Sequence, residues 1–499
     1  MPKFTKSKII ATIGPATSKR SVLKKIIGAG VDVCRLNFSH GTHENHAATY
    51  ELIRGINDEI AILADLSGPK IRVGEMKDGI VLKKGNQFIL TADYDILGDN
   101  KKVGINYSKL PSEVKKGDKI FIADGMLKLE VVSSDEQEIV SKILEGGKLT
   151  SRKGVNVPGA QISLYAPTEK DLEDIEFCTK LGVDFFAASF VRRPVDIAKI
   201  REVSARQSSQ VIEIEGYPSI DLGSVVIPII SKIEHEDAIK NYDEILNVTD
   251  GVMIARGDLG IEISPEQVPV IQKDLVERAN RAGVISVVAT EMLESMIYNA
   301  RPTRAEASDV ANAILDGADA VMLSGETATG KYPVKTVEYM DQIILCAEQI
   351  VKGRDPYWIS GKVEPSRSEA IAYAACKAAD IVGAKTILAV TRSGATPRII
   401  SKYRPQQHLV VATPYPNVVR ELQLVWGVAS ITMPVARTTD EMIYGAVVAA
   451  QKRGLIDELE EIVVVLGTLL GFPDRTNTVQ VLSVFDVLAS APLFEAQEE

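Results

Sequence analysis

The feature that most constrains the fold is a β-type segment that recurs eight times, each time ending in small or polar residues. Helical patterns such as TEKDLEDIEFCTKLG and RAEASDVANAILDGA fill most of the gaps. Apolar strands that alternate with amphipathic helices indicate a parallel sheet buried on both faces, and eight such units predict a (β/α)8 TIM barrel. The segments are KIIATIGPAT (8–17), VDVCRLNFSHG (31–41), IAILADLSGPK (60–70), VDFFAASFV (183–191), VVIPIISKIE (225–234), GVMIARGDLG (251–260), VISVVATEM (284–292) and AVMLSGETA (320–328).

Two further stretches differ in character from the barrel units. Residues 71–166 contain short strands with Asp-Gly, Lys-Gly and Gly-Gly turn signals, which predict a small β-barrel inserted as a lid at the top of the barrel. After about residue 350, helices alternate with TILAV, HLVVAT and EIVVVLGT, which indicates an open α/β domain. We therefore expect a barrel domain at 1–70 and 167–345, a lid at 71–166 and a C-terminal regulatory domain at 346–499, joined by KGRDPYWISGKVEPS.

Composition excludes several classes of function. The 499 residues carry 57 Lys and Arg against 67 Asp and Glu, a net charge of −10, so no nucleic-acid partner is expected. No apolar stretch approaches the roughly 18 to 20 residues that span a bilayer, so we expect a cytoplasmic protein without a membrane partner. The cysteines lack CxxC spacing and are expected to be reduced, buried thiols: Cys34, Cys178, Cys346 and Cys376.

Two motifs suggest other chemistry. GETATGKY, from Gly325 to Tyr332, has the glycines and lysine of a phosphate-binding P-loop, but Tyr332 stands where that loop requires Ser or Thr, whose hydroxyl holds magnesium. SHGTHENH spaces three histidines like metal ligands, although a solvated loop that leads into a helix explains the same spacing. These histidines are His40, His43 and His46.

A barrel of this kind has its active site at the carboxyl ends of its strands, and these ends are rich in charged and polar residues. In IISKIE, Lys232 and Glu234 alternate along the strand and so share a face. Glu234 and Asp258 offer carboxylate oxygens that suit Mg²⁺ or Mn²⁺. The complete set is Arg35, Asn37, Ser39, Asp65, Lys232, Glu234, Arg256, Asp258, Thr290, Ser324 and Glu326.

Lys232 is open to two interpretations. Barrel aldolases use a lysine to form an imine, and that chemistry needs no metal. Phosphoryl transfer instead needs lysine, arginine and a metal to neutralise the phosphate oxygens, and Arg35 and Arg72 are candidates for this role. The carboxylate pair beside Lys232 favours the second interpretation, although each arginine alone is also compatible with a surface salt bridge.

Seven motifs resemble those of the pyruvate kinase family from about residue 5 to 345, and the resemblance continues more weakly beyond. They are VCRLNFSHG, DLSGPKIR, KGVNVPG, SKIEH, DGVMIARGDLG, ATEMLESM and RPTRAEASDVANAILDGADAVMLSGETATGKYPV. The resemblance implies the last step of glycolysis, in which the phosphoryl group of phosphoenolpyruvate passes to ADP and the enolate is protonated to pyruvate. It also implies that GETATGKY ends the eighth barrel strand and is not a P-loop.

The resemblance also implies roles for individual residues. Lys232 would stabilise the transferring phosphoryl group and the enolate oxygen, and Arg35 would contact the phosphoryl group. Glu234 and Asp258 would bind the divalent metal. The substrate carboxylate would meet the backbone N–H groups of Gly257 and Asp258 together with the Thr290 hydroxyl. The nucleotide would meet Asn37, Arg72 and Lys153, and the proton-relay region would contain Ser324 and Glu326.

The chain departs from the family pattern in three places. The family's monovalent-cation site corresponds to Asn37, Ser39, Asp65 and Leu66. Potassium-requiring members carry Thr after the aspartate and Glu after Gly-Pro, whereas this chain has Leu66 and Lys70, so we expect activity without added K⁺ because the Lys70 ammonium replaces its charge. Glu291 stands where Gln is usual, and the stretch 201–227 is longer than usual and compatible with a surface hairpin.

The last domain carries a candidate effector site. TRSGATPR resembles a loop that holds an effector phosphate in regulated members, an anion nest formed by Thr391, Arg392, Ser393, Gly394 and Thr396. LGTLLGFPDRTN lacks the residues expected for fructose bisphosphate, so a sugar monophosphate or AMP is favoured, with an unregulated enzyme as the alternative. The family also implies a homotetramer. An imine-forming barrel lyase and a sensor that has lost turnover are the competing hypotheses.

Overall fold

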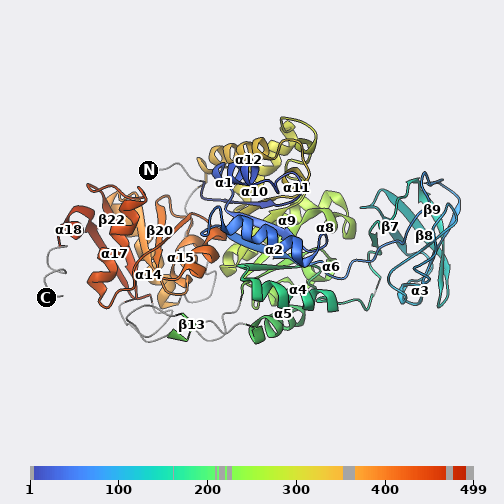
Figure 1. Ribbon diagram of the computed structural model, residues 1–499, viewed down its shortest axis with the longest axis horizontal. Coiled ribbons are helices and arrows are strands. Elements are labelled where there is room, and N and C mark those ends of the chain that lie inside the picture. Colours follow the sequence, from blue (N-terminus) through green and yellow to red (C-terminus); the bar gives the residue numbers. More distant parts are fainter. Residues whose placement is uncertain are drawn as a thin grey trace.

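The computed structural model describes residues 5–160, 162–207, 211–212, 220–221, 227–351, 366–467 and 476–490. Three bodies lie in a row in Figure 1, with the C-terminal domain at the left, the barrel in the centre and the inserted lid at the right. The linker segment 352–365 and most of the loop LGTLLGFPDRTN lie outside the described residues.

The central body is a closed barrel of eight parallel strands in the order β1-β18-β17-β16-β15-β12-β3-β2. Each of the eight predicted segments supplies one strand, so the predicted barrel is confirmed. The strands are β1 (Lys8–Thr12), β2 (Val33–Asn37), β3 (Ala61–Asp65), β12 (Phe185–Ala188), β15 (Ile229–Ile233), β16 (Gly251–Ala255), β17 (Ile285–Ala289) and β18 (Ala320–Leu323).

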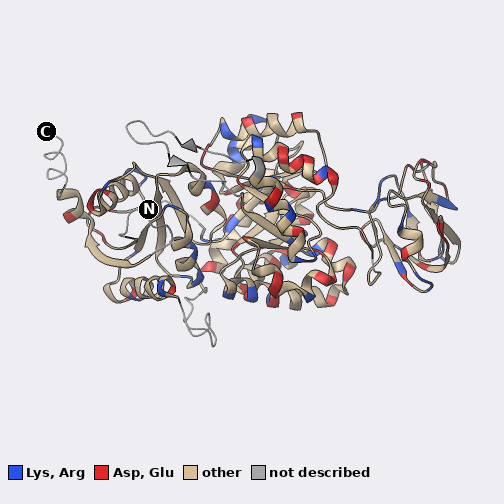
Figure 2. Cartoon of the chain, turned by 90° about the horizontal axis from the view of Figure 1, so that it is seen from below, with Lys and Arg blue, Asp and Glu red and all other residues tan. Residues whose placement is uncertain are grey.

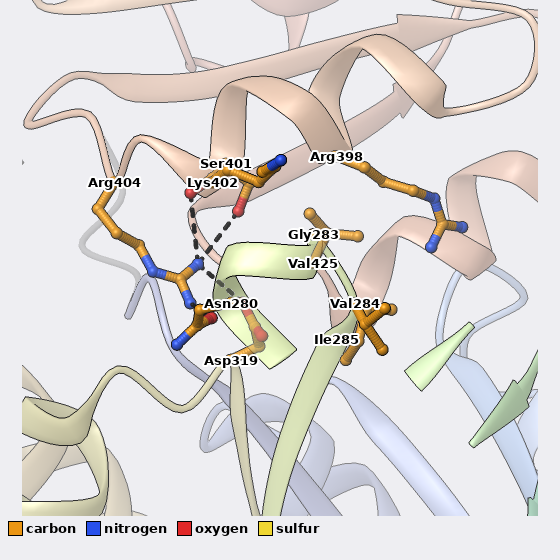
Figure 3. A pocket seen from close by; sticks show the side chains of 10 residues that line it. All are labelled: Asn280, Gly283, Val284, Ile285, Asp319, Arg398, Ser401, Lys402, Arg404 and Val425. Carbon is orange, nitrogen blue, oxygen red and sulfur yellow. Dashed lines mark hydrogen bonds and ion pairs between the residues drawn. The ribbon is translucent and has the colours of Figure 1, made fainter. Parts of the chain in front are cut away.

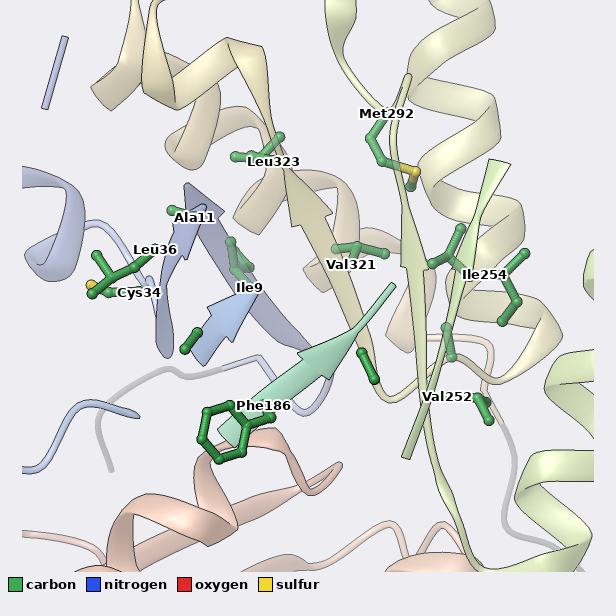
Figure 4. Close-up of a cluster of buried hydrophobic side chains, with 14 of the residues drawn as sticks. Ile9, Ala11, Cys34, Leu36, Phe186, Val252, Ile254, Met292, Val321 and Leu323 are labelled. Carbon is green, nitrogen blue, oxygen red and sulfur yellow. The ribbon is translucent and has the colours of Figure 1, made fainter. Parts of the chain in front are cut away.

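Alternation along the strands builds two apolar layers. Ile9 and Ala11 on β1 belong to the cluster between the strands and the surrounding helices, which Figure 4 draws. Ile10, between them, belongs to the cluster that fills the barrel and continues into the core of the C-terminal domain. Because side chains alternate across a strand, a strand buried on both faces needs apolar residues throughout. This is why the barrel segments are nearly continuous apolar runs.

The helices around the barrel begin and end at residues that suit helix termini. Thr168 caps α4 through a reciprocal pair of bonds with Asp171, and Thr303 caps α10 in the same way with Glu306. The longer helices are α1 (Arg20–Gly28), α2 (His43–Arg54), α4 (Glu169–Leu181), α5 (Pro194–Gln207), α9 (Val268–Ala282), α10 (Arg304–Asp316) and α12 (Pro333–Glu348). Short helices follow strands at the mouth: α6 (Glu236–Lys240), α7 (Tyr242–Leu246), α8 (Arg256–Glu262) and α11 (Gly325–Ala328).

The lid is a six-stranded sheet in the order β11-β7-β8-β9-β5-β6. Its two edges are joined, because Arg72 bridges Gly154 beside β11 and Val73 bridges Ile105 beside β6, so the sheet curls into a small barrel. The strands of the lid, including the separate pair β4 and β10, are β4 (Val81–Leu82), β5 (Gln87–Thr91), β6 (Lys102–Gly104), β7 (Lys119–Ile122), β8 (Leu127–Ser134), β9 (Glu138–Glu145), β10 (Gly147–Lys148) and β11 (Val155–Asn156); the helix α3 is Leu110–Glu113.

The C-terminal domain is a five-stranded sheet in the order β21-β20-β19-β22-β23, in which β23 runs antiparallel to β22. This agrees with the predicted open α/β domain. The strands are β19 (Thr386–Val390), β20 (His408–Thr413), β21 (Val428–Thr432), β22 (Glu461–Leu466) and β23 (Thr478–Ser483). The helices are α14 (Arg367–Val382), α15 (Ala395–Lys402), α16 (Pro416–Glu421), α17 (Thr439–Lys452) and α18 (Val484–Ala489).

A buried arginine joins this domain to the bottom of the barrel. Figure 3 shows Arg404 reaching toward Asp319 and Asn280. The Arg404 guanidinium pairs with Asp319 Oδ1 at 2.7 Å and donates to Asn280 Oδ1 and to the Gly317 carbonyl, each at 2.8 Å. Arg404 is 2 % exposed, and Asp319 directly precedes β18. The contact is therefore a desolvated ion pair between two domains.

Other expectations have mixed outcomes. Within the predicted extension, β13 (Val211–Ile212) and β14 (Ile220–Asp221) pair antiparallel, as a hairpin requires.

Three cysteines are buried free thiols, but Cys346 is exposed on α12, so the expectation of four buried thiols is wrong at that position. Cysteine spacing carries no information on which helix face a residue occupies. Figure 2 shows acidic and basic residues interspersed over the barrel helices. In the described ranges, no helix is long and apolar enough to cross a membrane.

Candidate active site

Lys232 lies at the centre of a buried polar cluster at the carboxyl ends of β3, β12 and β15. Its Nζ lies 2.8 Å from Ser189 Oγ, 2.9 Å from Glu234 Oε1 and 3.2 Å from Asp65 Oδ1. Burial alone would lower the pKa of Lys232, but the carboxylates of Asp65 and Glu234 raise it above its usual value. Lys232 is therefore a fixed cation at neutral pH. An imine-forming lysine needs a neutral amine, so this environment disfavours the aldolase hypothesis.

Asp65 orients both cations of the cluster. Its Oδ2 accepts from Arg35 Nε at 2.6 Å, and Arg35 NH1 donates to Thr12 Oγ1 at 2.8 Å. Burial would raise the pKa of Asp65, yet the charges of Arg35 and Lys232 lower it. Asp65 was predicted as one of the polar residues at the strand ends and as part of a monovalent-cation site. The structure shows that it holds Arg35 and Lys232 side by side, which is what a pair of phosphate-binding cations requires.

Glu234 and Asp258 form the predicted metal pair. Glu234 is 1 % exposed, and its Oε2 accepts the backbone N–H of Phe190 at 2.8 Å. Burial raises the pKa of Glu234, and the nearby charge of Asp258 raises it further. The oxygen donors of both carboxylates suit a hard divalent cation, and each carboxylate is also paired with an ammonium group, Glu234 with Lys232 and Asp258 with Lys70. Among the described residues, no group of three or more His, Cys, Asp and Glu side chains is placed to hold a metal ion.

The loop between β16 and α8 meets the end of β17. Gly257 N donates to Thr290 Oγ1 at 2.8 Å, and Thr290 has a left-handed φ of 69°. Arg256 NH2 donates to the carbonyls of Thr290 and Glu291, at 2.7 and 3.1 Å, and its NH1 pairs with Asp309 at 2.7 Å. The structure thus brings Gly257, Asp258 and Thr290 together. Arg256 serves as the tie that holds this left-handed turn.

Ser324 and Glu326 follow β18. Glu326 is 2 % exposed and accepts the backbone N–H groups of Ser324 and Leu293, at 2.7 and 3.1 Å. Ser324 Oγ is a buried hydroxyl without a hydrogen-bond partner among the described residues. Gly325–Ala328 forms α11 directly after the strand. GETATGKY therefore ends the eighth barrel strand, in agreement with the expectation that it is no P-loop.

The predicted nucleotide residues lie on both sides of the mouth. Arg72 and Lys153 are neighbours at the root of the lid, because Arg72 bridges Gly154 and the Lys153 carbonyl accepts from Val73 N at 2.9 Å. Asn37 ends β2 on the barrel, where its Oδ1 accepts from Ser39 N at 3.0 Å. The structure establishes these positions, while the nucleotide itself stays a prediction.

Lys70 makes a contact that the sequence did not predict. Its Nζ pairs with Asp258 Oδ1 at 2.8 Å, beside the predicted metal pair. Leu66 is buried, and its carbonyl accepts from Ser189 Oγ at 2.7 Å. The Lys70 ammonium thus places a fixed positive charge at the mouth. Ser189 and Phe190, which hold Lys232 and Glu234, were also missed, although both lie at the end of the predicted strand 183–191.

The three clustered histidines are engaged separately. His43 Nε2 lies 2.7 Å from Asp174 Oδ1, and the ring stacks on Phe177. His46 stacks on Phe38 and bonds to the carbonyl of His40 at 2.9 Å. These contacts explain the spacing of the histidines without a metal.

The candidate effector loop precedes α15. Gly394, at φ 78°, donates from its N–H to Thr391 Oγ1 at 3.0 Å, and Thr396 Oγ1 lies 2.6 Å from Thr476 Oγ1. Arg392 NH2 donates to the hydroxyl of Tyr415 at 3.2 Å. The hydroxyl and backbone groups of 391–396 thus lie together at the start of a helix, where an anion is favoured.

The barrel, its lid and the array of two buried cations, two buried carboxylates and the half-buried Asp258 define a barrel phosphotransferase. Residues 4–337 match the family model of the pyruvate kinase barrel domain, and residues 369–482 match that of the pyruvate kinase alpha/beta domain. The chain belongs to the pyruvate kinase family.

Characterised relatives agree with this assignment. A pyruvate kinase of Geobacillus stearothermophilus is 43% identical over 494 residues, which are 97% of this chain and 81% of that protein. A pyruvate kinase of Staphylococcus aureus strain MRSA252 is 41% identical over 493 residues, with the same coverage of 97% and 81%. The crystal structure of a pyruvate kinase from Cryptosporidium parvum superposes with a TM-score of 0.86 at 37% identity and covers 96% of each chain.

Proposed function

We propose that this chain transfers the phosphoryl group of phosphoenolpyruvate to ADP. The bond between phosphorus and the enol oxygen breaks, a bond from a β-phosphate oxygen of ADP to phosphorus forms, and the remaining enolate takes a proton on carbon to give pyruvate. The observation that carries this proposal is the placement of Lys232 and Arg35 on the two oxygens of Asp65, at 3.2 and 2.6 Å. Two cations that are held side by side on one carboxylate suit a phosphoryl group, because its charge lies on its outer oxygens.

The remaining residues bind the substrate and move the proton. We place the substrate carboxylate at the N–H groups of Gly257 and Asp258 and at the Thr290 hydroxyl, where Gly257 N now donates to Thr290. Ser324 is the candidate for the proton relay because its buried hydroxyl lacks a partner within the described chain, and Glu326 fixes the backbone of Ser324. We place the nucleotide between barrel and lid, where it meets Asn37, Arg72 and Lys153.

We assign Glu234 and Asp258 as the residues that hold Mg²⁺ or Mn²⁺. When bound, such an ion neutralises charge on phosphate oxygens. K⁺ is proposed to be dispensable, because Lys70 already places an ammonium 2.8 Å from Asp258. Assay in K⁺-free buffer tests this, and a strong K⁺ requirement would refute it.

Wider properties are proposed on the family's pattern. We propose a barrel at 1–70 and 167–345, a lid at 71–166 and a regulatory domain at 346–499, and the strands of each sheet fall within these ranges. We also propose a cytoplasmic homotetramer, which light scattering would detect as four times the 54.1 kDa chain. A sugar monophosphate or AMP is proposed at the loop 391–396, and unchanged kinetics with either compound would leave that domain structural.

The decisive assay follows pyruvate formation from phosphoenolpyruvate and ADP, with and without Mg²⁺. Lys232→Met should lower turnover by roughly 10³-fold because it removes a cation aimed at the transition state. Lys240→Met is the matched control, since Lys240 is a 61 % exposed lysine on α6. Borohydride treatment with substrate should trap no covalent adduct. Trapping at Lys232, or full turnover by Lys232→Met, would refute the proposal.

A further inference from the structure

The short helix α8 contacts the lid at one end and the segment that leads into the lid at the other. Near its start, Asp258 Oδ1 pairs at 2.8 Å with Nζ of Lys70, which lies in the segment between β3 and the lid. At its last residue, Glu262 Oε1 accepts from Asn156 Nδ2 at 3.3 Å, and Asn156 lies on β11 of the lid. Figure 1 shows α8 on the side of the barrel that faces the lid. The helix α8, which carries the proposed metal ligand Asp258, is therefore joined to the lid and to the segment that leads into it.

Glu262 is poorly explained as a packing residue. Its side chain is 5 % exposed, and Oε2 is buried without a hydrogen bond from any described residue; His235 Nε2 lies 3.5 Å from it. Arg192 Nε is likewise buried and without a partner in the described ranges. Both residues line a cavity of about 30 Å³ between the lid root and the barrel, which is large enough for a water molecule. Burying a carboxylate oxygen in this way costs free energy that an apolar side chain would avoid.

The lid strand that Glu262 holds also carries the proposed nucleotide residues. Asn156 lies two residues beyond Gly154, which bridges Arg72, and three beyond Lys153. Val155 N donates to the Ile71 carbonyl at 2.8 Å, so the segments that enter and leave the lid are hydrogen-bonded to each other. Fixing Asn156 therefore fixes Arg72 and Lys153 relative to α8.

We propose that Glu262 is a positioning residue for the nucleotide. Its hydrogen bond with Asn156 holds the root of the lid against α8, so that Arg72 and Lys153 face the phosphates of ADP while Asp258 on the same helix faces the metal. This inference rests on the proposed function. It assigns Glu262 no contact with either substrate, so its effect is confined to the substrate that the lid contacts.

The experiment measures KM for ADP and for phosphoenolpyruvate separately in Asn156→Ala, Glu262→Ala and the double variant. Each single change should raise KM for ADP about three- to tenfold, the loss expected for one ordinary hydrogen bond, and change KM for phosphoenolpyruvate less than twofold. The KM of the double variant for ADP should be no higher than that of the single variant with the higher KM, because both changes remove the same hydrogen bond. Glu262→Gln keeps an acceptor for Asn156 and should restore most of the affinity for ADP.

A matched control and a second readout keep the test sharp. Glu130→Ala removes an ion pair with Lys119 within the lid, away from α8, and should leave both KM values unchanged. Hydrogen exchange at the β11 amides should accelerate in Asn156→Ala and Glu262→Ala even without substrate. The inference is overturned if both KM values rise equally, if the single effects multiply in the double variant, or if Glu262→Gln behaves like Glu262→Ala. Absence of turnover in the unaltered chain would instead refute the proposed function.

Discussion

Arg404→Met tests whether the two domains share one cooperative structure. The change removes the partner of Asp319 Oδ1, while Asp319 Oδ2 keeps its bonds from Ser286 N and Oγ at 2.8 and 2.9 Å. Met roughly preserves the length of the side chain without its charge. Asp319 is only 5 % exposed, so the carboxylate is left buried and half satisfied.

The magnitude follows from the burial of the pair. Removing one partner of a buried ion pair costs about 3 to 5 kcal/mol. For a domain of about 150 to 250 residues, each kcal/mol of lost stability lowers the melting temperature by about 2 to 4 °C. Arg404→Met should therefore lower the melting temperature by roughly 6 to 20 °C. Asp319→Asn, combined with Arg404→Met, removes the stranded charge and should recover a substantial part of that loss.

Calorimetry measures the loss, and tryptophan fluorescence locates it. The Arg404 guanidinium lies 4.8 Å from the ring of Trp426, so this ring reports on the contact. Trp358 is the second of the two tryptophans, and a Trp358→Phe background isolates the signal. Arg281→Met is the control, because the Arg281 and Glu277 side chains are 49 % and 41 % exposed and an i,i+4 surface pair contributes about 0.3 to 0.5 kcal/mol. Melting of Arg404→Met within 2 °C of the control would show that the pair does not join the domains.

Three further predictions concern pH, cations and the active-site turn. Burial raises the pKa of Glu421 to about 7, so between pH 4.5 and 7 the folded chain keeps a proton that the unfolded chain releases, and stability falls as pH rises. Glu421→Gln should therefore raise the free energy of unfolding by at most about 3 kcal/mol at pH 8, seen as a higher melting temperature, and leave it nearly unchanged at pH 5; equal effects at both pH values would contradict this. Lys70→Glu should make turnover depend on K⁺, by about tenfold or more between K⁺-free and K⁺-containing buffer, and K⁺-independent turnover would show that Lys70 does not replace the ion. Asp309→Ala frees Arg256 from its 2.7 Å pair and should lower kcat about tenfold by loosening the turn at Thr290, with unaltered kcat as the opposing result.

The sequence was sufficient where the signal is local. Strand ends are visible as apolar runs that stop at polar residues, and alternation places Lys232 and Glu234 on one face, where they lie 2.9 Å apart. Contacts between distant segments are different. The bond from Lys70 to Asp258 spans 188 residues and depends on where the lid settles. Similarly, Arg404 reaches Gly317 across 87 residues, and no periodicity encodes such a pairing.

Backbone conformation was the second feature that the sequence did not predict. Phe190 and Thr290 have φ values of 56° and 69°, which β-branched and aromatic residues rarely adopt. Propensity would predict extended backbone at both, yet this left-handed geometry is what points Phe190 N at Glu234 and allows Thr290 Oγ1 to meet Gly257. The charged residues of the candidate site were therefore visible in the sequence, whereas Ser189, Phe190 and the turns that orient the site were not.

The lid interrupts the chain between two strands that are themselves partners. Phe185 on β12 pairs with Leu63 on β3, and α4 alone is enough to connect them. Lengthening a loop adds little entropy cost to its closure. The pairing of β3 with β12 therefore tolerates a whole domain inserted between them. Evolution, or a protein engineer, is thereby free to swap the whole insert as a cassette and to retune the choice of nucleotide while leaving the chemical apparatus beneath it intact.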